Sequence, residues 1–164
     1  MTLVIGCDAY GYALKEVVKR RLAERGIPAE DLGVHGERES RAYYDIAFEA
    51  ASRLARGEAS RAVLVCGTGM GMAIVANKLP GVYAAVCENP RAAKHARSIN
   101  NANVLTLGGL VTPPETASEI VDTWLDTDFT AGWEPSIQEF LRRSMADIAV
   151  LEQKASRLNE GRKA

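Results

Sequence analysis

The segment from Cys66 to Gly71, Cys-Gly-Thr-Gly-Met-Gly, places a thiol, a hydroxyl and three glycines in close succession. The apolar run Ala62–Val65 before it is typical of a buried strand, and a helical pattern follows, so Cys66 is expected where a strand ends. Glycines let backbone N–H groups approach a ligand, and a helix start favours a thiolate and a developing oxyanion. A buried cysteine before a tight turn explains the glycines equally well, because the segment matches neither GxGxxG nor Walker A.

The elements that must position this thiol follow an alternating order. Short apolar runs without polar alternation predict strands, and residues at 3–4 spacing predict the helices between them. This pattern indicates a doubly wound α/β domain, with a mostly parallel five-stranded sheet covered by helices on both faces. The predicted strands are Thr2–Gly6, Ala62–Val65, Val82–Val86 and Asn103–Leu107, and the predicted helices are Leu14–Leu22, Ile46–Leu54, Met70–Lys78, Pro90–Ser98 and Pro114–Leu125.

Ligands of such sheets bind beyond the carboxyl ends of the strands. Asp8, the loop Gly67–Gly71 and the segment Asn100–Asn103 are therefore expected to share that edge. Asp8 could instead cap the first helix.

The C-terminal part of the chain has a different pattern. After a turn-rich stretch, apolar residues recur at roughly helical spacing and predict one long helix, either a lid on its own domain or an arm onto a partner subunit. We favour the arm, because five strands and their helices already close a domain. The predicted division is a domain at 1–130 and a helical arm at 131–164 in the oligomer interface. The apolar stripe consists of Ile137, Leu141, Ile148, Leu151 and Leu158.

Composition excludes several classes of partner. The formal charge of −1, with acidic and basic residues interspersed, argues against nucleic acid, and no apolar stretch approaches the ~20 residues of a membrane span. The three cysteines have no CxxC or zinc-ligand spacing, which predicts free thiols in the cytoplasm and no metal. Of these, Cys7 and Cys87 are expected in the core. A small molecule is the expected partner.

Several motifs occur in order: Gly6-Cys-Asp8, Cys66 to Gly71, Ala76-Asn-Lys78 and Asn100 to Leu105. On these motifs the sequence, from about Leu3 to Leu125, resembles the family of type B ribose-5-phosphate isomerases and galactose-6-phosphate isomerase subunits. The resemblance implies a Rossmann-like fold and a homo-oligomer, dimer or tetramer, with sites shared between subunits. It also implies aldose–ketose isomerisation of a sugar phosphate through a cis-enediolate, without metal or cofactor.

The resemblance also implies roles for individual residues. Cys66 would carry the proton between C1 and C2 of the sugar, and Thr68 would polarise or relay protons at the substrate oxygens. Preorganised N–H groups are an efficient way to hold an enediolate, and those of Gly67, Gly69 and Gly71 are implied to do so. Asp8, Tyr43 and Asn100 would bind substrate, although Tyr43 could equally be a half-buried aromatic.

The sequence departs from the family where its ribose enzymes bind phosphate and open the sugar ring. A histidine usual after Asp8 is Ala9, and the ring-opening histidine before the Asn pair is Ile99. A usual arginine is Leu110, and the basic tail motif is replaced by Gly132–Ser136.

These departures favour a linear tetrose phosphate, erythrulose 4-phosphate or erythrose 4-phosphate, which needs no ring opening. The alternatives are an isomerase of ribose 5-phosphate and ribulose 5-phosphate, or a non-catalytic subunit that binds sugar phosphate. A nucleotide-binding module is disfavoured, because no acidic residue that could bind a ribose follows a nucleotide-binding fingerprint at the usual place. Phosphate would then be bound by Arg142 or Arg143 of a partner chain, or by Arg91, although any one of these can be simply solvated.

Overall fold

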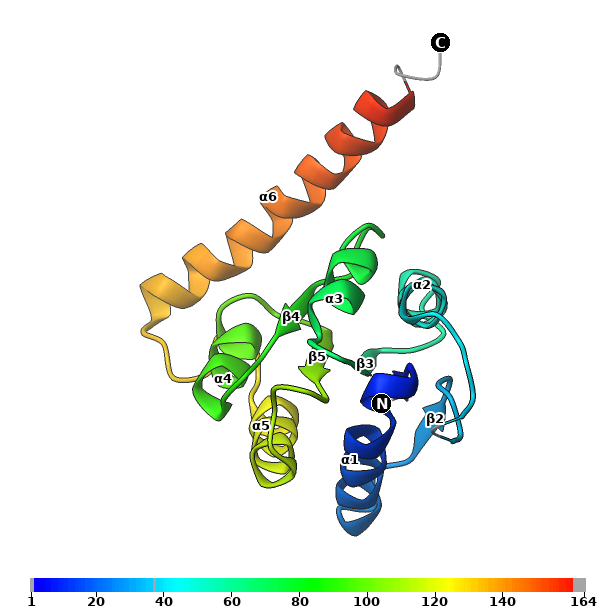
Figure 1. Ribbon diagram of the computed structural model, residues 1–164. Helices are drawn as coiled ribbons and strands as arrows, with labels where there is room; N and C mark the ends of the chain where they lie inside the picture. The colour runs from blue at the N-terminus through cyan, green and yellow to red at the C-terminus, as the bar shows by residue number, and fades with distance from the viewer. Residues whose placement is uncertain (1, 37, 161–164) are drawn as a thin grey trace.

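A single sheet organises the computed structural model, which describes residues 2–36 and 38–160 (Figure 1). Its strand order is β2-β1-β3-β5-β4, and every neighbouring pair is parallel. The predicted doubly wound α/β fold is confirmed. The strands are β1 (Leu3–Cys7), β2 (Ala29–Asp31), β3 (Arg61–Cys66), β4 (Ala84–Val86) and β5 (Val104–Gly108).

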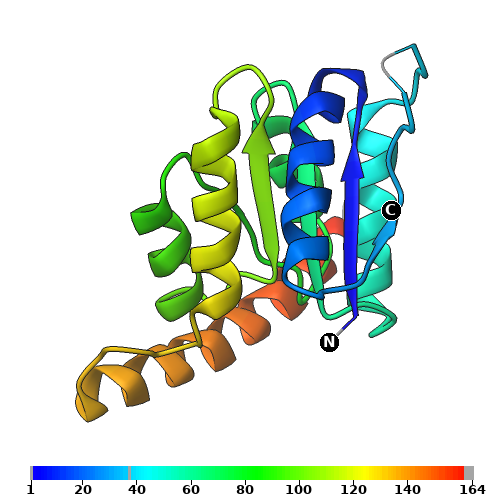
Figure 2. The same ribbon diagram turned by 90° about the horizontal axis from the view of Figure 1, so that it is seen from below.

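Helices cover both faces of the sheet. Helices α1 and α5 lie on one face with α4 beside α5, and α2 and α3 lie on the other (Figure 2). Each face has its own buried apolar cluster, which explains why the strands lack polar alternation. The helices are α1 (Tyr12–Glu24), α2 (Tyr43–Ala55), α3 (Met70–Ala76), α4 (Pro90–Ser98), α5 (Pro114–Asp126) and α6 (Pro135–Glu160), with a 3₁₀ turn at Ala9–Gly11. None of the helices described is long and apolar enough to cross a bilayer.

The edge strands differ from the sequence prediction. Strand β2 has only three residues, too few for its pattern to be noticed. Strand β4 is shorter than predicted. Two asparagine side chains form hydrogen bonds with the backbone where the strand begins. Asn77 exchanges two hydrogen bonds with the backbone of Ala84, at 2.7 and 2.9 Å, and Asn103 accepts from the Tyr83 N–H at 2.8 Å. The Asn77 motif thus braces an edge strand.

Helix α6 crosses the amino ends of the strands, opposite to the ends at which the arrows point (Figure 2). Leu141 is buried there, and Glu152 accepts from the Gly81 N–H at 3.2 Å. The other members of the predicted stripe are exposed. A groove of about 480 Å³ runs between α6, α4 and β4. The proposed division at residue 130 stays a prediction, and residues 1 and 161–164 lie outside the described part of the chain.

A fully buried ammonium group ties α1 to the loop after β2. Lys15 Nζ donates to Asp31 Oδ2 at 2.8 Å and to the Val34 carbonyl at 2.6 Å. Burial acts to raise the pKa of Asp31, but hydrogen bonds from Lys15 and Lys19 outweigh it and hold that pKa below its ordinary value. The loop after β2 is therefore fixed by a charge pair.

We predict that Asp31→Ala lowers the free energy of unfolding by about 3 kcal/mol, because it leaves the Lys15 ammonium buried without its partner. Since the folded-state pKa of Asp31 is lowered, the contribution is present above its unfolded pKa and is lost as pH falls through the folded value. Urea unfolding at several pH values measures both effects. Glu58→Ala, which removes an exposed partner of Arg56, is the control and should change stability little.

Candidate active site

The carboxyl ends of β1 and β3 meet at the point where the chain order of the sheet reverses. Strand β1 leads outward to β2, whereas β3 continues to the other half of the sheet. The parallel register pairs Cys7 with Val65, so Asp8 and Cys66 follow side by side. Helix α1 leaves on one face and α3 on the other, and in doubly wound folds the crevice between two such helices is where ligands bind. The prediction that Asp8 and the Cys66 loop share an edge is confirmed.

Cys66 ends β3 with its thiol directed toward the following loop. The side chain is only 5% exposed, and Sγ accepts a hydrogen bond from the Gly69 N–H at 3.2 Å. The sulfur is therefore held by a main-chain donor. Gly69 has a φ of +76°, and a Cβ atom there would lie 3.0 Å from the Leu107 backbone, so only glycine fits. The N–H group of Gly69, which was one of three N–H groups expected to bind the ligand, therefore donates to the Cys66 sulfur instead.

The two other cysteines have different surroundings. Cys7 and Cys87 are buried in the apolar cluster of α1 and α5, as predicted. Burial raises the pKa of each thiol to about 12. At neutral pH both are therefore protonated core side chains.

Tyr43 and Thr68 also lie at the Cys66 loop. Tyr43 comes from the first turn of α2, and its ring packs against Gly71, where a Cβ atom would lie 2.6 Å from Cε2. The ring is partly exposed at the crevice. Thr68 is exposed, and its Oγ1 accepts from the Met70 N–H at 3.4 Å. A hydroxyl, a phenol and the Cys66 thiol thus border one loop.

Asp8 caps a helical turn and also lies at the candidate site, so it combines the two positions that the sequence left open. Its Oδ1 accepts from the Gly11 N–H at 3.0 Å and caps the 3₁₀ turn before α1. It also lies beside Cys66 at the crevice, largely buried. Burial raises the pKa of Asp8, although backbone N–H groups partly oppose this.

Asn100 does not lie at this edge, so the expectation for the segment Asn100–Asn103 is wrong. The segment leads from α4 into β5, and a loop that enters a parallel strand lies at the amino edge. Asn100 is exposed and lines the groove beside α6, together with Ile99. Asn103 binds the backbone at Gly81 and Tyr83 instead. One chain therefore does not bring Asn100 to Cys66.

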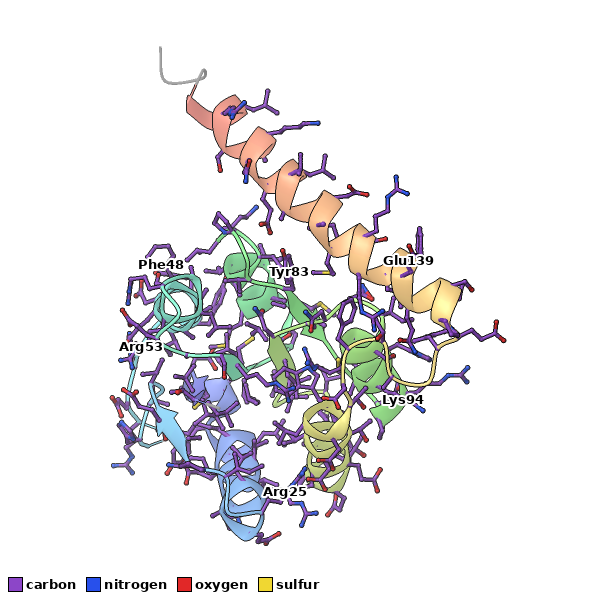
Figure 3. The ribbon with its side chains drawn as sticks, turned by 180° about the vertical axis from the view of Figure 1, so that it is seen from behind. Arg25, Phe48, Arg53, Tyr83, Lys94 and Glu139 are labelled. Carbon is purple, nitrogen blue, oxygen red and sulfur yellow. The ribbon has the colours of Figure 1, made fainter. Side chains whose placement is uncertain are left out.

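Two of the arginines expected to bind phosphate, Arg142 and Arg143, lie on α6 at the amino edge of the sheet, opposite to the edge of Cys66. Arg142 is held on α6 by Thr130 Oγ1 at 3.2 Å and Gln138 Oε1 at 2.9 Å, and Arg143 is exposed beside it. Arg91 is exposed at the start of α4, next to the outermost strand β4. Figure 3 shows the side chains from behind and labels Tyr83, which lines the groove beside α6.

Three residues near these sites, Tyr10, Leu110 and His95, are not indicated by the motifs as site residues. Tyr10, in the turn after Asp8, and Leu110, after β5, both lie against Gly67. His95 faces the α6 groove one helical turn before Ile99, and its buried Nδ1 has no hydrogen-bond partner. A large aromatic between Asp8 and Gly11 is the signal that could have indicated Tyr10. Within the described ranges no cluster of three His, Cys, Asp or Glu side chains could hold a metal ion.

Comparison with known proteins identifies the family. The family model described as Ribose/Galactose Isomerase matches residues 3–139. The chain belongs to this family. The predicted membership is confirmed, and with it the prediction of a sugar-phosphate isomerase that interconverts aldoses and ketoses.

Relatives of this isomerase include enzymes with different named substrates. The 4-deoxy-4-sulfo-D-erythrose isomerase of Clostridium sp. (strain MSTE9) is 43% identical over 93% of this chain and 96% of its own. The D-erythrulose-4-phosphate isomerase of Pectobacterium atrosepticum is 39% identical over 80% of this chain and 87% of its own. The solved ribose-5-phosphate isomerase B of Clostridium thermocellum superposes with a TM-score of 0.85 and 39% identity, covering 94% of this chain and 99% of that one.

We predict that iodoacetamide modifies Cys66 of the native isomerase before it modifies Cys7 or Cys87. The reactive species is the thiolate, which the raised pKa values of about 12 suppress at the two core cysteines. Peptide mass spectrometry after timed exposure at pH 8 measures the three rates. Unfolded protein, in which all three should react alike, is the control. Equal labelling in the native state would contradict the distinction.

Proposed function

We propose that this isomerase acts on a four-carbon sugar with a terminal anionic group, and interconverts D-erythrulose 4-phosphate with its aldose, erythrose 4-phosphate. The observation that carries the proposal is Ile99. Its apolar side chain lines the groove next to Asn100 and cannot transfer the proton that furanose opening requires. In a tetrose 4-phosphate the oxygen that would close the ring is esterified, so the sugar is linear. The name of the Pectobacterium atrosepticum relative supports this assignment.

In the proposed reaction the Cys66 thiolate is the base. It removes the proton from C2 of the aldose, the C1–C2 double bond forms, and the negative charge passes to the C1 oxygen. The proton on the C2 oxygen moves to the C1 oxygen through Thr68, and the Cys66 thiol returns its proton to C1, which leaves the ketone at C2. Backbone N–H groups of Gly67 and Gly71 hold the enediolate, and Asp8 and Tyr43 bind substrate hydroxyls.

We further propose a homo-oligomer, a dimer or tetramer, whose sites combine two chains. Asn100, Arg142 and Arg143 lie with α6 at the amino edge of the sheet, whereas Cys66 lies at the carboxyl edge. Only a second copy can bring the two groups together, and the exposed apolar side chains of α6 offer a surface for it. An arginine of the partner chain, Arg142 or Arg143, then binds the anion, with Arg91 as the weaker alternative. The free thiols support a cytoplasmic location.

A terminal sulfonate is a second candidate for the anionic group. The Clostridium relative named for a sulfo-sugar supports it. A phosphate monoester carries about 1.5 to 2 negative charges at pH 7, whereas a sulfonate carries one. Ala9 and Leu110 add no positive charge beside Asp8 and Gly67, which suits the smaller charge. A 4-sulfo tetrose also lacks the ring-closing oxygen. Ribose 5-phosphate and a non-catalytic binding role are the alternatives.

We predict that kcat/KM for erythrulose 4-phosphate, or for its 4-deoxy-4-sulfo analogue, exceeds that for ribose 5-phosphate by about tenfold or more, because only the pentose requires ring opening. Initial rates with all three sugars measure this. A preference for ribose 5-phosphate at low concentration would overturn the four-carbon assignment.

We predict that Cys66→Ser lowers turnover by about a thousandfold, because a serine hydroxyl is too weak an acid to replace the thiol. Loss of deuterium incorporation from deuterium oxide into C1 and C2, followed by NMR, reports the proton transfer itself. Cys7→Ser is the matched control and should retain incorporation. If the wild-type protein binds the sugar but incorporates no deuterium, it is a binding subunit.

We predict that Cys66→Ser and Asn100→Ala chains, each inactive alone, recover about a quarter of the wild-type activity when they are refolded together. Half of the two-fold dimers then contain one chain of each kind, and one of the two sites in such a dimer is intact. Activity of the mixture against each variant refolded alone measures this. If both residues act within one chain, mixing restores nothing.

A further inference from the structure

Two large apolar side chains flank the residue that follows Cys66. A Cβ atom at Gly67 would lie 3.3 Å from Leu110 Cδ1 and 3.7 Å from Tyr10 Cβ. Leu110 is 72% exposed and Tyr10 is 71% exposed. Apolar side chains of this size are thus presented to solvent at the mouth of the crevice, beside the proposed base.

Backbone contacts fix both residues to the Cys66 loop. The Gly109 N–H donates to the Cys66 carbonyl at 2.7 Å, and the Leu110 N–H donates to the Gly67 carbonyl at 2.9 Å. A Cβ atom at Gly109 would lie 2.4 Å from the Tyr10 carbonyl oxygen, so the loops after β1 and β5 touch each other. The main chain at Tyr10 and at Leu110 is therefore fixed relative to Cys66.

Their position determines what they can do to a substrate. The reacting carbons must lie at Cys66, so any part of the sugar that extends past Gly67 meets Tyr10 and Leu110. An aliphatic side chain and an aromatic ring supply no positive charge for a terminal anion there. A sugar that runs in this direction and is longer by one hydroxymethylene group would bring that group against them.

We propose that Tyr10 and Leu110 form a wall that limits the length of sugar accepted, and that they are specificity-determining residues of this isomerase. The proposal rests on one part of the proposed function, namely that the reacting carbons of the sugar lie at Cys66. It is independent of the argument from Ile99, which concerns ring opening at the other edge of the sheet. Discrimination by one carbon unit is typically about tenfold to two-hundredfold in enzymes whose pockets are closed by apolar walls.

The test compares two ketoses, erythrulose 4-phosphate and ribulose 5-phosphate. Both are linear, because phosphate blocks the ring-closing oxygen of the pentulose and a four-carbon ketose has no oxygen that could close a five-membered ring. Ring opening therefore does not affect the comparison. In Leu110→Ala, Tyr10→Ala and the double variant, the ratio of kcat/KM values should shift toward the five-carbon ketose by about tenfold or more in the double variant, chiefly through the KM for ribulose 5-phosphate. Leu110→Met, which conserves volume, should keep the wild-type ratio.

Val111→Ala and Phe48→Ala are matched controls, because they shorten exposed side chains, 47% and 57% exposed, and leave Tyr10 and Leu110 in place. In both control variants the ratio of kcat/KM values should stay unchanged. An unchanged ratio in the folded double variant would overturn the proposal while leaving the proposed function intact. A wild-type preference for ribose 5-phosphate would overturn the four-carbon assignment, but a shift on trimming would still support the wall.

Discussion

The parallel pairing of β3 with β1 on one side and β5 on the other is the constraint on which the site depends. It sets Cys66 between the ends of two neighbouring strands, so that Asp8 arrives from one side and Gly109 from the other. The register, which is fixed by two buried faces, leaves no freedom to slide by one residue. The chemistry of the loop after β3 is therefore positioned by the sheet rather than by the loop itself.

The sequence contains enough to predict the fold and half of the site. Runs of Val, Leu and Ile located the central strands, and Cys66 was predicted at a strand end because the glycines follow it immediately. The expectation for Asn100 is wrong although the sequence holds the signal, because its segment comes before the strand that it adjoins and therefore lies at the amino end of that strand. The aromatic between Asp8 and Gly11 marks Tyr10 in the sequence but does not tell what Tyr10 contacts, because its contact with Gly67 joins loops far apart in sequence.

The chain separates its polar groups between the two edges of one sheet. The thiol and carboxylate lie at the carboxyl edge, whereas Asn100, His95 and the α6 arginines lie at the other. In a shared-site assembly this separation links folding, association and chemistry, because a lone subunit holds two incomplete halves that face away from each other. In such an assembly the long helix α6 would carry residues to the partner's site as well as pack against the partner.

The group that stabilises the Cys66 sulfur is a main-chain amide, that of Gly69. A main-chain donor survives any substitution that preserves the backbone, so mutation can alter the side chains around the proposed base without removing this hydrogen bond. Reactivity and substrate choice can then evolve independently. Such independence accounts for a family in which one scaffold serves relatives named for a pentose phosphate, a tetrose phosphate and a sulfonated sugar.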